Sequence, residues 1–212
     1  MDNNKFKQRT DYTLNHPLNE GLMSEDPFKE FYEWYDVADE RVEKDVNAMV
    51  LSTYDGEFPR ARVVLLKELD ERGFVYFTNY LSDKVAETDA HPKASITFYW
   101  KELERQVRIE GVMEKISSEE SEEYFQTRPL GSRIGAWVSP QSREIPNRQW
   151  LENKVVECES KFKEDVKRPV FWGGLRLVPS YFEFWQGQSS RLHDRIVYKN
   201  KKGVWVKSRV AP

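Results

Sequence analysis

The most unusual combination of residue types lies near the carboxyl end, between residues 182 and 195. There Trp185 is followed by Arg191, His193 and Arg195, which stand at alternate positions. In an extended segment these three potentially cationic side chains would project to the same side of the chain. Like charges repel one another, so such a face either is solvated or surrounds an anionic or electron-rich group. The spacing alone leaves both interpretations open.

A second group of cations flanks an apolar stretch. Arg62 and Lys67 stand at its ends, and residues 63–66 between them read as a buried strand. A charge at each end of a buried strand can clamp two phosphate groups, or its long side chain can extend along the apolar surface to water. From the spacing, extension to water is the favoured interpretation.

A third group, Tyr124, Arg128 and Ser132, follows a helix start. Ser117 with Glu120 forms a capping box, which predicts a helix running to about residue 127. Tyr124 and Arg128 are four residues apart, so they share a face of that helix. Two hydroxyls and a guanidinium can bind a phosphate, whereas an ordinary helix end would place Arg128 at the negative end of the helix dipole. On spacing alone the ordinary helix end is favoured.

Several common catalytic arrangements are missing from the sequence. The three histidines, His16, His91 and His193, lie far apart and have no metal-ligand spacing with a cysteine, so no metal site is expected. Neither a glycine-rich phosphate loop nor a G-x-S-x-G nucleophile motif occurs. Redox or group-transfer chemistry would therefore depend on a bound organic cofactor.

The elements that must position these residues are mostly strands. Apolar stretches bounded by turn residues predict strands over 48–53, 60–69, 74–78, 94–100, 106–116, 175–178, 181–185, 195–198 and 204–210. Helices are expected from Asp26-Pro27, over 84–88, from Ser117 and from Asn147. This pattern predicts a closed or nearly closed barrel, mostly β with peripheral helices (α+β).

Two of the expected helices carry apolar stripes. In the first, the stripe is expected to comprise Phe28, Phe31, Tyr32 and Tyr35. In the last, it is expected to comprise Trp150, Leu151, Val155, Cys158 and Phe162. Residues 1–23 are polar and poorly periodic, so we expect a mobile arm there, followed by a single domain over 24–212.

Composition narrows the class of protein. Of the 212 residues, 14% are aromatic, which indicates a packed globular protein. The net charge of −3 argues against a general nucleic-acid binder, which would normally carry a basic excess. Cys158 is the only cysteine, no apolar run approaches membrane-spanning length, and the amino terminus has no signal-peptide core. A cytoplasmic protein without a membrane segment is therefore expected.

At the residues quoted above the sequence resembles the pyridoxamine 5′-phosphate oxidase family. The run Arg191–Arg195 after Trp185 looks like the signature of that family. The resemblance extends over residues 9–212, and its further motifs are Arg62 to Lys67, Phe77-Thr78, Gln106, Gln141-Ser142, Trp172-Gly173-Gly174 and Arg209-Val210-Ala211-Pro212.

The resemblance implies an FMN-binding split β-barrel that forms a homodimer, with FMN in the two clefts between subunits. By position, the residues expected to bind FMN are Arg62, Val63, Val64, Leu65, Leu66, Lys67, Phe77, Thr78, Lys84, Gln106, Gln141, Ser142, Trp185 and Arg195. The implied reaction is the oxidation of pyridoxamine 5′-phosphate and pyridoxine 5′-phosphate to pyridoxal 5′-phosphate, with O2 reoxidising the flavin to give H2O2.

The substrate site is implied in the same way. Its phosphate would be held by Lys67, Tyr124, Arg128 and Ser132. Arg191, Leu192 and His193 would contact the substrate, with Arg191 and His193 over its pyridine ring as the catalytic pair. Arg9 and Tyr12 resemble an Arg-x-x-Tyr pair that closes over bound substrate.

One position departs from the family. A basic residue commonly precedes the lysine at Lys84, and this chain has Asp83. A lost charge-assisted hydrogen bond is worth about 1.5–3 kcal/mol, so we expect Asp83 to turn to solvent while Lys84 and Arg62 retain the flavin.

Two other functions remain open at this point. The first is another FMN oxidoreductase on the same barrel, of the flavin reductase type, and the second is a non-catalytic binder of FMN or pyridoxal phosphate. A nucleic-acid-binding barrel is opposed by the net charge of −3.

Overall fold

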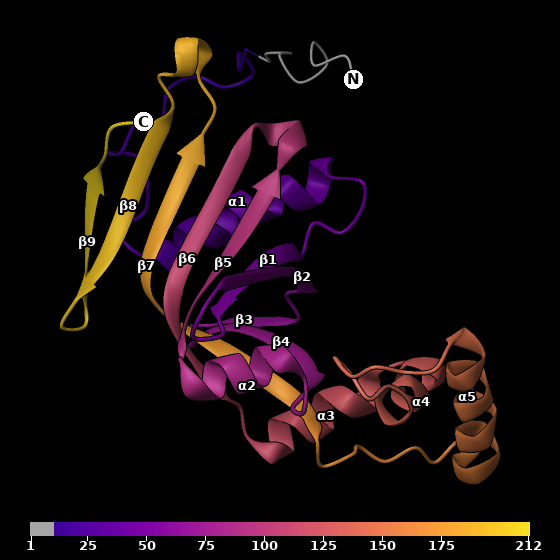
Figure 1. Cartoon of the computed structure of the whole chain (residues 1–212). Coiled ribbons are helices and arrows are strands. Elements are labelled where there is room, and N and C mark those ends of the chain that lie inside the picture. Colours follow the sequence, from indigo (N-terminus) through magenta and orange to yellow (C-terminus); the bar gives the residue numbers. More distant parts are fainter. Residues whose placement is uncertain (1–10) are drawn as a thin grey trace. The chain divides into compact units, whose positions relative to one another are not determined.

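The protein contains more strand than helix (Figure 1); the structure, a computed structural model, describes residues 11–212. The strands are β1 (Ala48–Tyr54), β2 (Pro59–Leu65), β3 (Glu68–Asp70), β4 (Gly73–Asn79), β5 (Lys93–Trp100), β6 (Arg105–Lys115), β7 (Trp172–Gln186), β8 (Asp194–Lys201) and β9 (Val204–Arg209). The helices are α1 (Pro27–Arg41), α2 (Asp83–Ala90), α3 (Ser118–Thr127), α4 (Leu130–Val138) and α5 (Arg148–Phe162), with 3₁₀ turns η2 (Lys101–Leu103) and η3 (Ser189–Arg191).

Backbone hydrogen bonds join the nine strands of the described residues in the order β2-β1-β5-β6-β7-β4-β3, with β8 paired to β7 and β9 to β8. The chain divides into two compact units. Unit 1 comprises the described residues up to Val50, Ser95–Glu110 and Pro179–Pro212. Unit 2 comprises Leu51–Ala94 and Gly111–Val178. Strands β1, β5, β6 and β7 each contribute residues to both units, and the single domain expected over 24–212 stays a prediction.

In unit 2, β4 is a core strand. Residues 74–76 are at most 1% exposed, and the strand pairs antiparallel with the first half of β7, from Phe74 opposite Leu177 to Asn79 opposite Trp172. A strand that is buried on both faces reads as a continuous apolar run, which is the pattern of this segment.

Helices α3, α4 and α5 of unit 2 lie near one another (Figure 1), and all three contribute to one apolar cluster. The predicted capping box is confirmed, because Ser117 and Glu120 each accept the backbone N–H of the other. Asn147 caps α5 by accepting the Trp150 N–H. The part of the predicted stripe that packs against the cluster is Leu151, Val155, Cys158 and Phe162. Trp150 lies instead against Lys154, whose Nζ is 5.9 Å from the ring centroid.

In unit 1, α1 begins as predicted at Asp26, whose carboxylate caps the helix. Its buried side chains include Phe31, Trp34 and Ala38, at spacings of three and four residues, while Tyr32 is 43% exposed. Phe28 packs against Phe182 and Trp205, and Phe31 and Tyr35 both pack against Trp100. The predicted stripe was therefore wrong only for Tyr32, and the buried face continues through Trp34 and Ala38.

The second half of β7 pairs antiparallel with β8, and β8 pairs with β9 (Figure 1). Trp185 lies opposite Arg195, and Gln186 lies opposite Asp194. Residues 187–193 therefore form the connection between two paired strands. The pairing fixes both ends of the segment from residue 182 to residue 195, which is called the candidate segment below.

Three element predictions were wrong. Helix α4 was not predicted, because Gly131 and Gly135 lower its helix propensity and its start has no side-chain cap. The strands expected at 175–178 and 181–185 are one strand, β7. Pro179 is tolerated there because it falls between the residues that pair with β4 and those that pair with β8. The strand expected over 60–69 is divided into β2 and β3.

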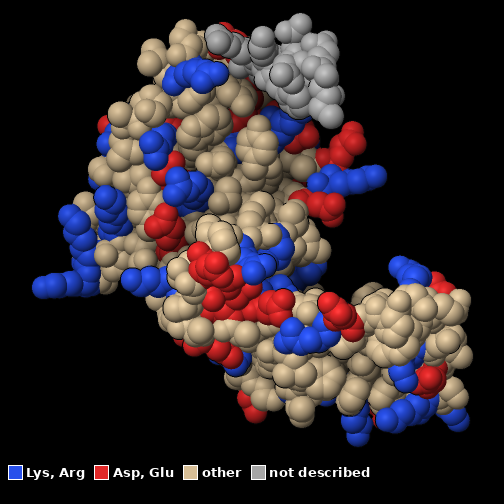
Figure 2. Space-filling view, in the orientation of Figure 1, with Lys and Arg blue, Asp and Glu red and all other residues tan. Residues whose placement is uncertain are grey.

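Within the described residues, no helix combines the length and the apolar character that crossing a membrane requires. Figure 2 shows Lys and Arg side chains interspersed with Asp and Glu over the visible face, as expected for a net charge of −3.

Candidate active site

One cavity of unit 2 has a volume of about 610 Å³. Residues from β2, β4, α2, α3, α4 and the start of β7 line it. Twelve of these lining residues belong to the predicted site: Arg62, Val63, Val64, Leu65, Lys67, Phe77, Thr78, Lys84, Tyr124, Arg128, Ser132 and Gln141. Its volume is within the usual range for a small-molecule or cofactor site. The second and third groups of the sequence thus share one cavity, whereas the first group, at residues 185–195, belongs to unit 1.

One part of the cavity lining is a layered aromatic group. Phe77 and Tyr124 are stacked, with centroids 3.8 Å apart and an interplanar angle of 12°. Trp172 is parallel to both rings, at 5.4 Å from Phe77 and 6.3 Å from Tyr124. The guanidinium carbon of Arg128 lies 4.4 Å from the Trp172 ring centroid, a cation–π contact.

Arg128 is the C-cap residue of α3, and its guanidinium is only partly satisfied. Its Nη1 is buried and has no hydrogen-bond partner among the described residues, and burial lowers the pKa of the group. A buried donor without a partner is costly. A bound anion would remove that cost and would also stabilise the charge.

A polar group forms another part of the lining. The Lys84 ammonium donates to the Thr78 hydroxyl at 3.3 Å, to the Ser82 hydroxyl at 3.1 Å and to Gln141 Oε1 at 3.1 Å. Burial lowers the pKa of Lys84, and the nearby charge of Arg62 lowers it further. This half-buried cation is therefore positioned by neutral oxygens, which leaves its charge available to an anion.

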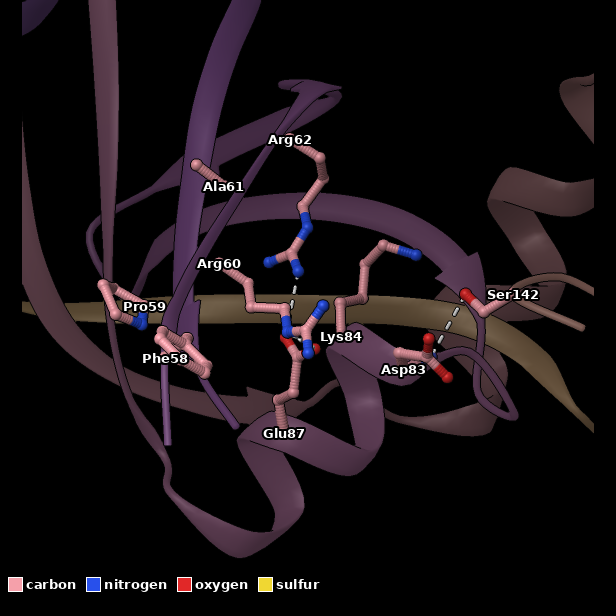
Figure 3. A pocket seen from close by; sticks show the side chains of 9 residues that line it. All are labelled: Phe58, Pro59, Arg60, Ala61, Arg62, Asp83, Lys84, Glu87 and Ser142. Atoms are coloured by element: carbon pink, nitrogen blue, oxygen red, sulfur yellow. Dashed lines mark hydrogen bonds and ion pairs between the residues drawn. The ribbon is translucent and has the colours of Figure 1, made fainter. Parts of the chain in front are cut away.

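A second cavity of about 490 Å³ shares Arg62 and Lys84 with the first. Figure 3 shows the guanidinium groups of Arg60 and Arg62 directed toward Glu87 of α2, while Asp83 points toward Ser142. Arg62 pairs with Glu87 at 2.9 Å.

Arg62 is fixed within the protein. It also donates to Thr53, and its side chain is only 24% exposed. The favoured interpretation of extension to water is wrong for Arg62, because Glu87 holds its charge. Lys67 is exposed. The burial predicted for 63–66 holds for Leu66, but Val63 is 65% and Leu65 38% exposed.

In unit 1, three rings of the candidate segment and its neighbour form an edge-on cluster. The centroid of Tyr12 lies 5.6 Å from those of Trp185 and His193, and Trp185 lies 4.8 Å from His193. The Gln188 N–H donates to His193 Nδ1 at 3.1 Å. A neutral His193 therefore carries its proton on Nε2, where it can act as a donor. A Cβ at Gly187 would come within 2.7 Å of the Tyr12 ring, so the cluster requires glycine there.

Arg195 is held by a buried carboxylate. Its Nε donates to Glu183 Oε1 and its Nη2 donates to Glu183 Oε2, both at 2.9 Å. Its Nη1 donates to the Ala211 carbonyl at 2.8 Å. Burial alone would raise the pKa of Glu183, but the hydrogen bonds from Arg195 and Tyr181 outweigh it and lower the pKa. The hydrogen bonds to Glu183 raise the pKa of Arg195.

The segment before β8 is not extended. Residues 189–191 form a 3₁₀ turn, and Ser190 and Arg191 have φ angles of 56° and 62°. Arg191, His193 and Arg195 were expected to project to the same side because the segment was taken to be extended. That assumption about the backbone was wrong. Leu192 in the same connection is 72% exposed.

Comparison with known proteins identifies the family of the chain. The family model described as "Pyridoxamine 5'-phosphate oxidase" matches residues 37–162. A second model, "Pyridoxine 5'-phosphate oxidase C-terminal dimerisation region", matches residues 172–212. The chain belongs to the pyridoxamine 5′-phosphate oxidase family.

Relatives in this family span nearly the whole chain. A pyridoxine/pyridoxamine 5′-phosphate oxidase of Pseudomonas paraeruginosa is 50% identical over 96% of both chains. One of Cupriavidus taiwanensis is 51% identical over 92% of this chain and 93% of that protein. The predicted family membership is thereby confirmed.

Solved structures agree with the fold. The structure of PhzG from Burkholderia lata, in complex with tetrahydrophenazine-1-carboxylic acid, has a TM-score of 0.88 and 25% identity, covering 94% of this chain and all of that one. A pyridoxamine 5′-phosphate oxidase-related, FMN-binding protein from Nostoc punctiforme has a TM-score of 0.71 and 17% identity, covering 90% and 100% of the two chains. The predicted fold class, mostly β with peripheral helices and of the split-barrel type, is confirmed.

The remaining predicted residues of this family member lie elsewhere. Ser142 lines the second cavity, and Leu66 is buried in unit 2. The candidates in unit 1 are Tyr12, Gln106, Trp185, Arg191, Leu192, His193 and Arg195. Arg9 lies outside the described residues.

Several residues that line the cavities were not predicted as site residues, and Trp172 and Arg60 are two of them. Trp172 was recognised only as part of a family motif, and its stacking against Phe77 and Arg128 depends on the pairing of β7 with β4. Arg60 lines the second cavity beside Arg62. Its position two residues before Arg62 in a strand is the signal that could have identified it.

Proposed function

We propose that the chain is an FMN-dependent oxidase that converts pyridoxamine 5′-phosphate and pyridoxine 5′-phosphate to pyridoxal 5′-phosphate. The observation that carries the proposal is the unsatisfied, buried Nη1 of Arg128 in a cavity that also presents Lys67 and Lys84. Two anionic ligands, a cofactor phosphate and a substrate phosphate, would match these separate cations. Relatives about 50% identical that carry this activity in their names support the assignment.

The cavity residues fit FMN. Arg62, Lys84 and Ser142 would hold its phosphate end, and Thr78 with Gln141 would support Lys84 through the hydrogen bonds described above. The apolar stretch at 63–65 would lie along the flavin, since it lines the same cavity and is partly exposed. When bound, FMN supplies a two-electron acceptor for a hydride from the substrate and passes the electrons to O2, which gives H2O2.

The substrate phosphate would be bound by Arg128, Lys67, Tyr124 and Ser132. Arg128 can donate from its unpaired Nη1, and its guanidinium is held near the Trp172 ring by a cation–π contact. Charge-assisted hydrogen bonds of this kind are short and strong. Binding a remote phosphate fixes the substrate ring without contact at the reacting carbon.

Arg191 and His193 would orient the substrate and polarise its reacting centre. Because the Gln188 N–H donates to Nδ1 of His193, the Nε2–H of the neutral ring would be the donor available to a ligand. Tyr12, packed against Trp185 and His193, would cover this part of the site together with Arg9.

A homodimer would complete the site. The match of residues 172–212 to a dimerisation region supports this assembly. In this assembly each flavin would lie at the subunit interface.

A turnover assay separates the proposal from its rivals. Oxygen-dependent formation of an aldehyde from pyridoxamine 5′-phosphate is the predicted result. Oxidation of a reduced nicotinamide without aldehyde formation would indicate a flavin reductase, and a yellow but inert protein would indicate a non-catalytic binder. The compound bound in the PhzG structure is a carboxylic acid without a phosphate. Activity only on compounds of that class would contradict the proposal that the substrates are phosphorylated.

A further inference from the structure

Three consecutive residues of one turn contact the start of α2. Gln141 Oε1 accepts from Lys84 Nζ at 3.1 Å, and the Ser142 hydroxyl accepts the Asp83 N–H at 3.3 Å. Arg143 donates to the Asp83 carboxylate at 2.7 Å. The turn is therefore attached to the first residues of α2 by two side-chain contacts and one ion pair.

Arg143 forms hydrogen bonds with backbone carbonyls as well as with the Asp83 carboxylate. Its guanidinium also donates to the Leu81 carbonyl at 2.9 Å and to the Ser142 carbonyl at 3.2 Å. Ser142 has a φ of 67°, in the left-handed region that serine rarely adopts. Such a conformation persists when its surroundings hold it in place. Arg143 spans the strained residue and the segment before α2, so it supplies that restraint.

The ion pair between Arg143 and Asp83 is expected to orient the turn and to contribute little to the free energy of unfolding. The side chains of Arg143 and Asp83 are 56% and 58% exposed, and exposed pairs contribute little to folding. Arg143 does not line either cavity, whereas Asp83, Lys84 and Ser142 line the second one. Asp83 was expected to turn to solvent; its carboxylate is half exposed and engaged by Arg143, although it still borders the cavity.

We propose that Asp83 and Arg143 are positioning residues for the cofactor phosphate. Their ion pair fixes the turn at 141–143 against α2, so that Ser142 and Lys84 face the cavity that Figure 3 shows. The pair also neutralises the Asp83 charge, which would otherwise repel a phosphate. This inference rests on the proposed binding of FMN.

Asp83 could instead weaken FMN binding by repelling the phosphate, and the two roles predict opposite effects of a substitution on FMN affinity. If Asp83 only repels the phosphate, then removing its charge strengthens FMN binding. If it positions Arg143 and the turn, removing its charge weakens FMN binding. The sign of the effect of Asp83→Asn thus distinguishes the two roles.

The test measures the Kd of purified apoprotein for FMN and for riboflavin, which lacks the phosphate, by quenching of flavin fluorescence. Asp83→Asn and Arg143→Gln should each weaken FMN binding about threefold to tenfold, the range between an exposed pair and a charge-assisted hydrogen bond. Riboflavin binding should change less than FMN binding. The double variant should be no weaker than either single one.

Arg148→Gln is the matched control, because Arg148 forms an exposed pair with Glu152 on α5, at 83% and 52% exposure. Its FMN and riboflavin affinities should equal those of the wild type. Tighter FMN binding by Asp83→Asn, additive losses in the double variant, or equal losses for both flavins would overturn the positioning role. A wild-type protein that binds neither flavin would contradict the proposed function, and this inference with it.

Discussion

Two arginines of the candidate site, Arg128 and Arg195, differ in what satisfies them. Arg195 makes two hydrogen bonds to Glu183 and one to the Ala211 carbonyl, so the chain itself fixes it. Arg128 has a buried Nη1 without a partner among the described residues, and an aromatic ring is its principal support. A guanidinium whose hydrogen bonds are made within the chain has a fixed position before any ligand binds. A buried guanidinium with an unpaired N–H gains a hydrogen bond when an anion binds.

The same contrast separates Lys84 and Arg128 of unit 2 from Arg195 of unit 1, although Arg62 of unit 2 is paired with Glu87. The cavity of unit 2 contains cations whose pKa values burial lowers, Lys84 and Arg128. The segment of unit 1 contains Arg195, whose hydrogen bonds to Glu183 raise its pKa. We therefore expect ligand binding to depend most on unit 2, and the orientation of the reacting groups to depend on the prearranged segment of unit 1.

The largest expected effect tests the segment of unit 1. Arg191→Ala and His193→Ala should each lower kcat about 100-fold, because loss of an orienting or proton-donating group costs that much or more. FMN retention, read from the absorbance of the purified protein, should change little. Wild-type turnover in both variants would remove these residues from the mechanism.

Arg128→Ala tests the unsatisfied cation. The KM for pyridoxamine 5′-phosphate should rise about tenfold to 100-fold, since a charge-assisted hydrogen bond is worth about 1.5–3 kcal/mol. The preference over unphosphorylated pyridoxamine should shrink by the same factor. Arg148→Ala on α5 serves as the control, and an unchanged KM in Arg128→Ala would show that this guanidinium does not bind the substrate phosphate.

Glu183→Gln tests whether Arg195 is preset. Removing one partner of a buried pair leaves the other charge uncompensated, so unfolding free energy should fall by about 2–4 kcal/mol. The lowered pKa of Glu183 means that its contribution to stability is complete above the unfolded-state pKa of glutamate and is lost as the pH falls through the folded value. Denaturant unfolding at neutral and acidic pH should show a smaller acid loss in the variant. Equal acid losses in both proteins would contradict the prediction.

The pH dependence of FMN binding tests Lys84 and has the smallest expected effect. Its pKa is lowered in the free protein, and a bound phosphate should raise it. Between these two values binding takes up a proton, so FMN affinity should fall with rising pH by up to about tenfold per pH unit. Lys84→Arg, which stays charged, should flatten this dependence. A wild-type affinity that does not change at alkaline pH would show that Lys84 does not contact the phosphate.

Local patterns predicted the parts of the fold that depend on neighbouring residues. The capping box of Ser117 and Glu120 and the Asn147 cap were visible because each lies within one helix turn. Arg128 follows the last residue of α3 in an extended conformation, so the predicted helix face is not what places it near Tyr124. The structure brings Tyr124 and Arg128 into the cavity with Lys67, as the family resemblance implied.

Features that depend on distant segments could not be read in this way. The partner that keeps Arg62 from water is Glu87, 25 residues further on, and the ring that supports Arg128 is Trp172, which β7 brings to the site. Helix α4 was hidden by its glycines, and the connection containing Arg191 turns where an extended chain was assumed. In each case tertiary contacts overrode the local pattern.

The central claim is that a phosphorylated substrate and FMN are bound together by separate cations of the chain. An absorbance spectrum of the purified protein, recorded before and after anaerobic addition of pyridoxamine 5′-phosphate, tests it most directly. We predict a flavin spectrum whose long-wavelength band bleaches on addition and returns when air is admitted. A flavin band that persists after addition, or a protein that takes up no flavin, would contradict the account.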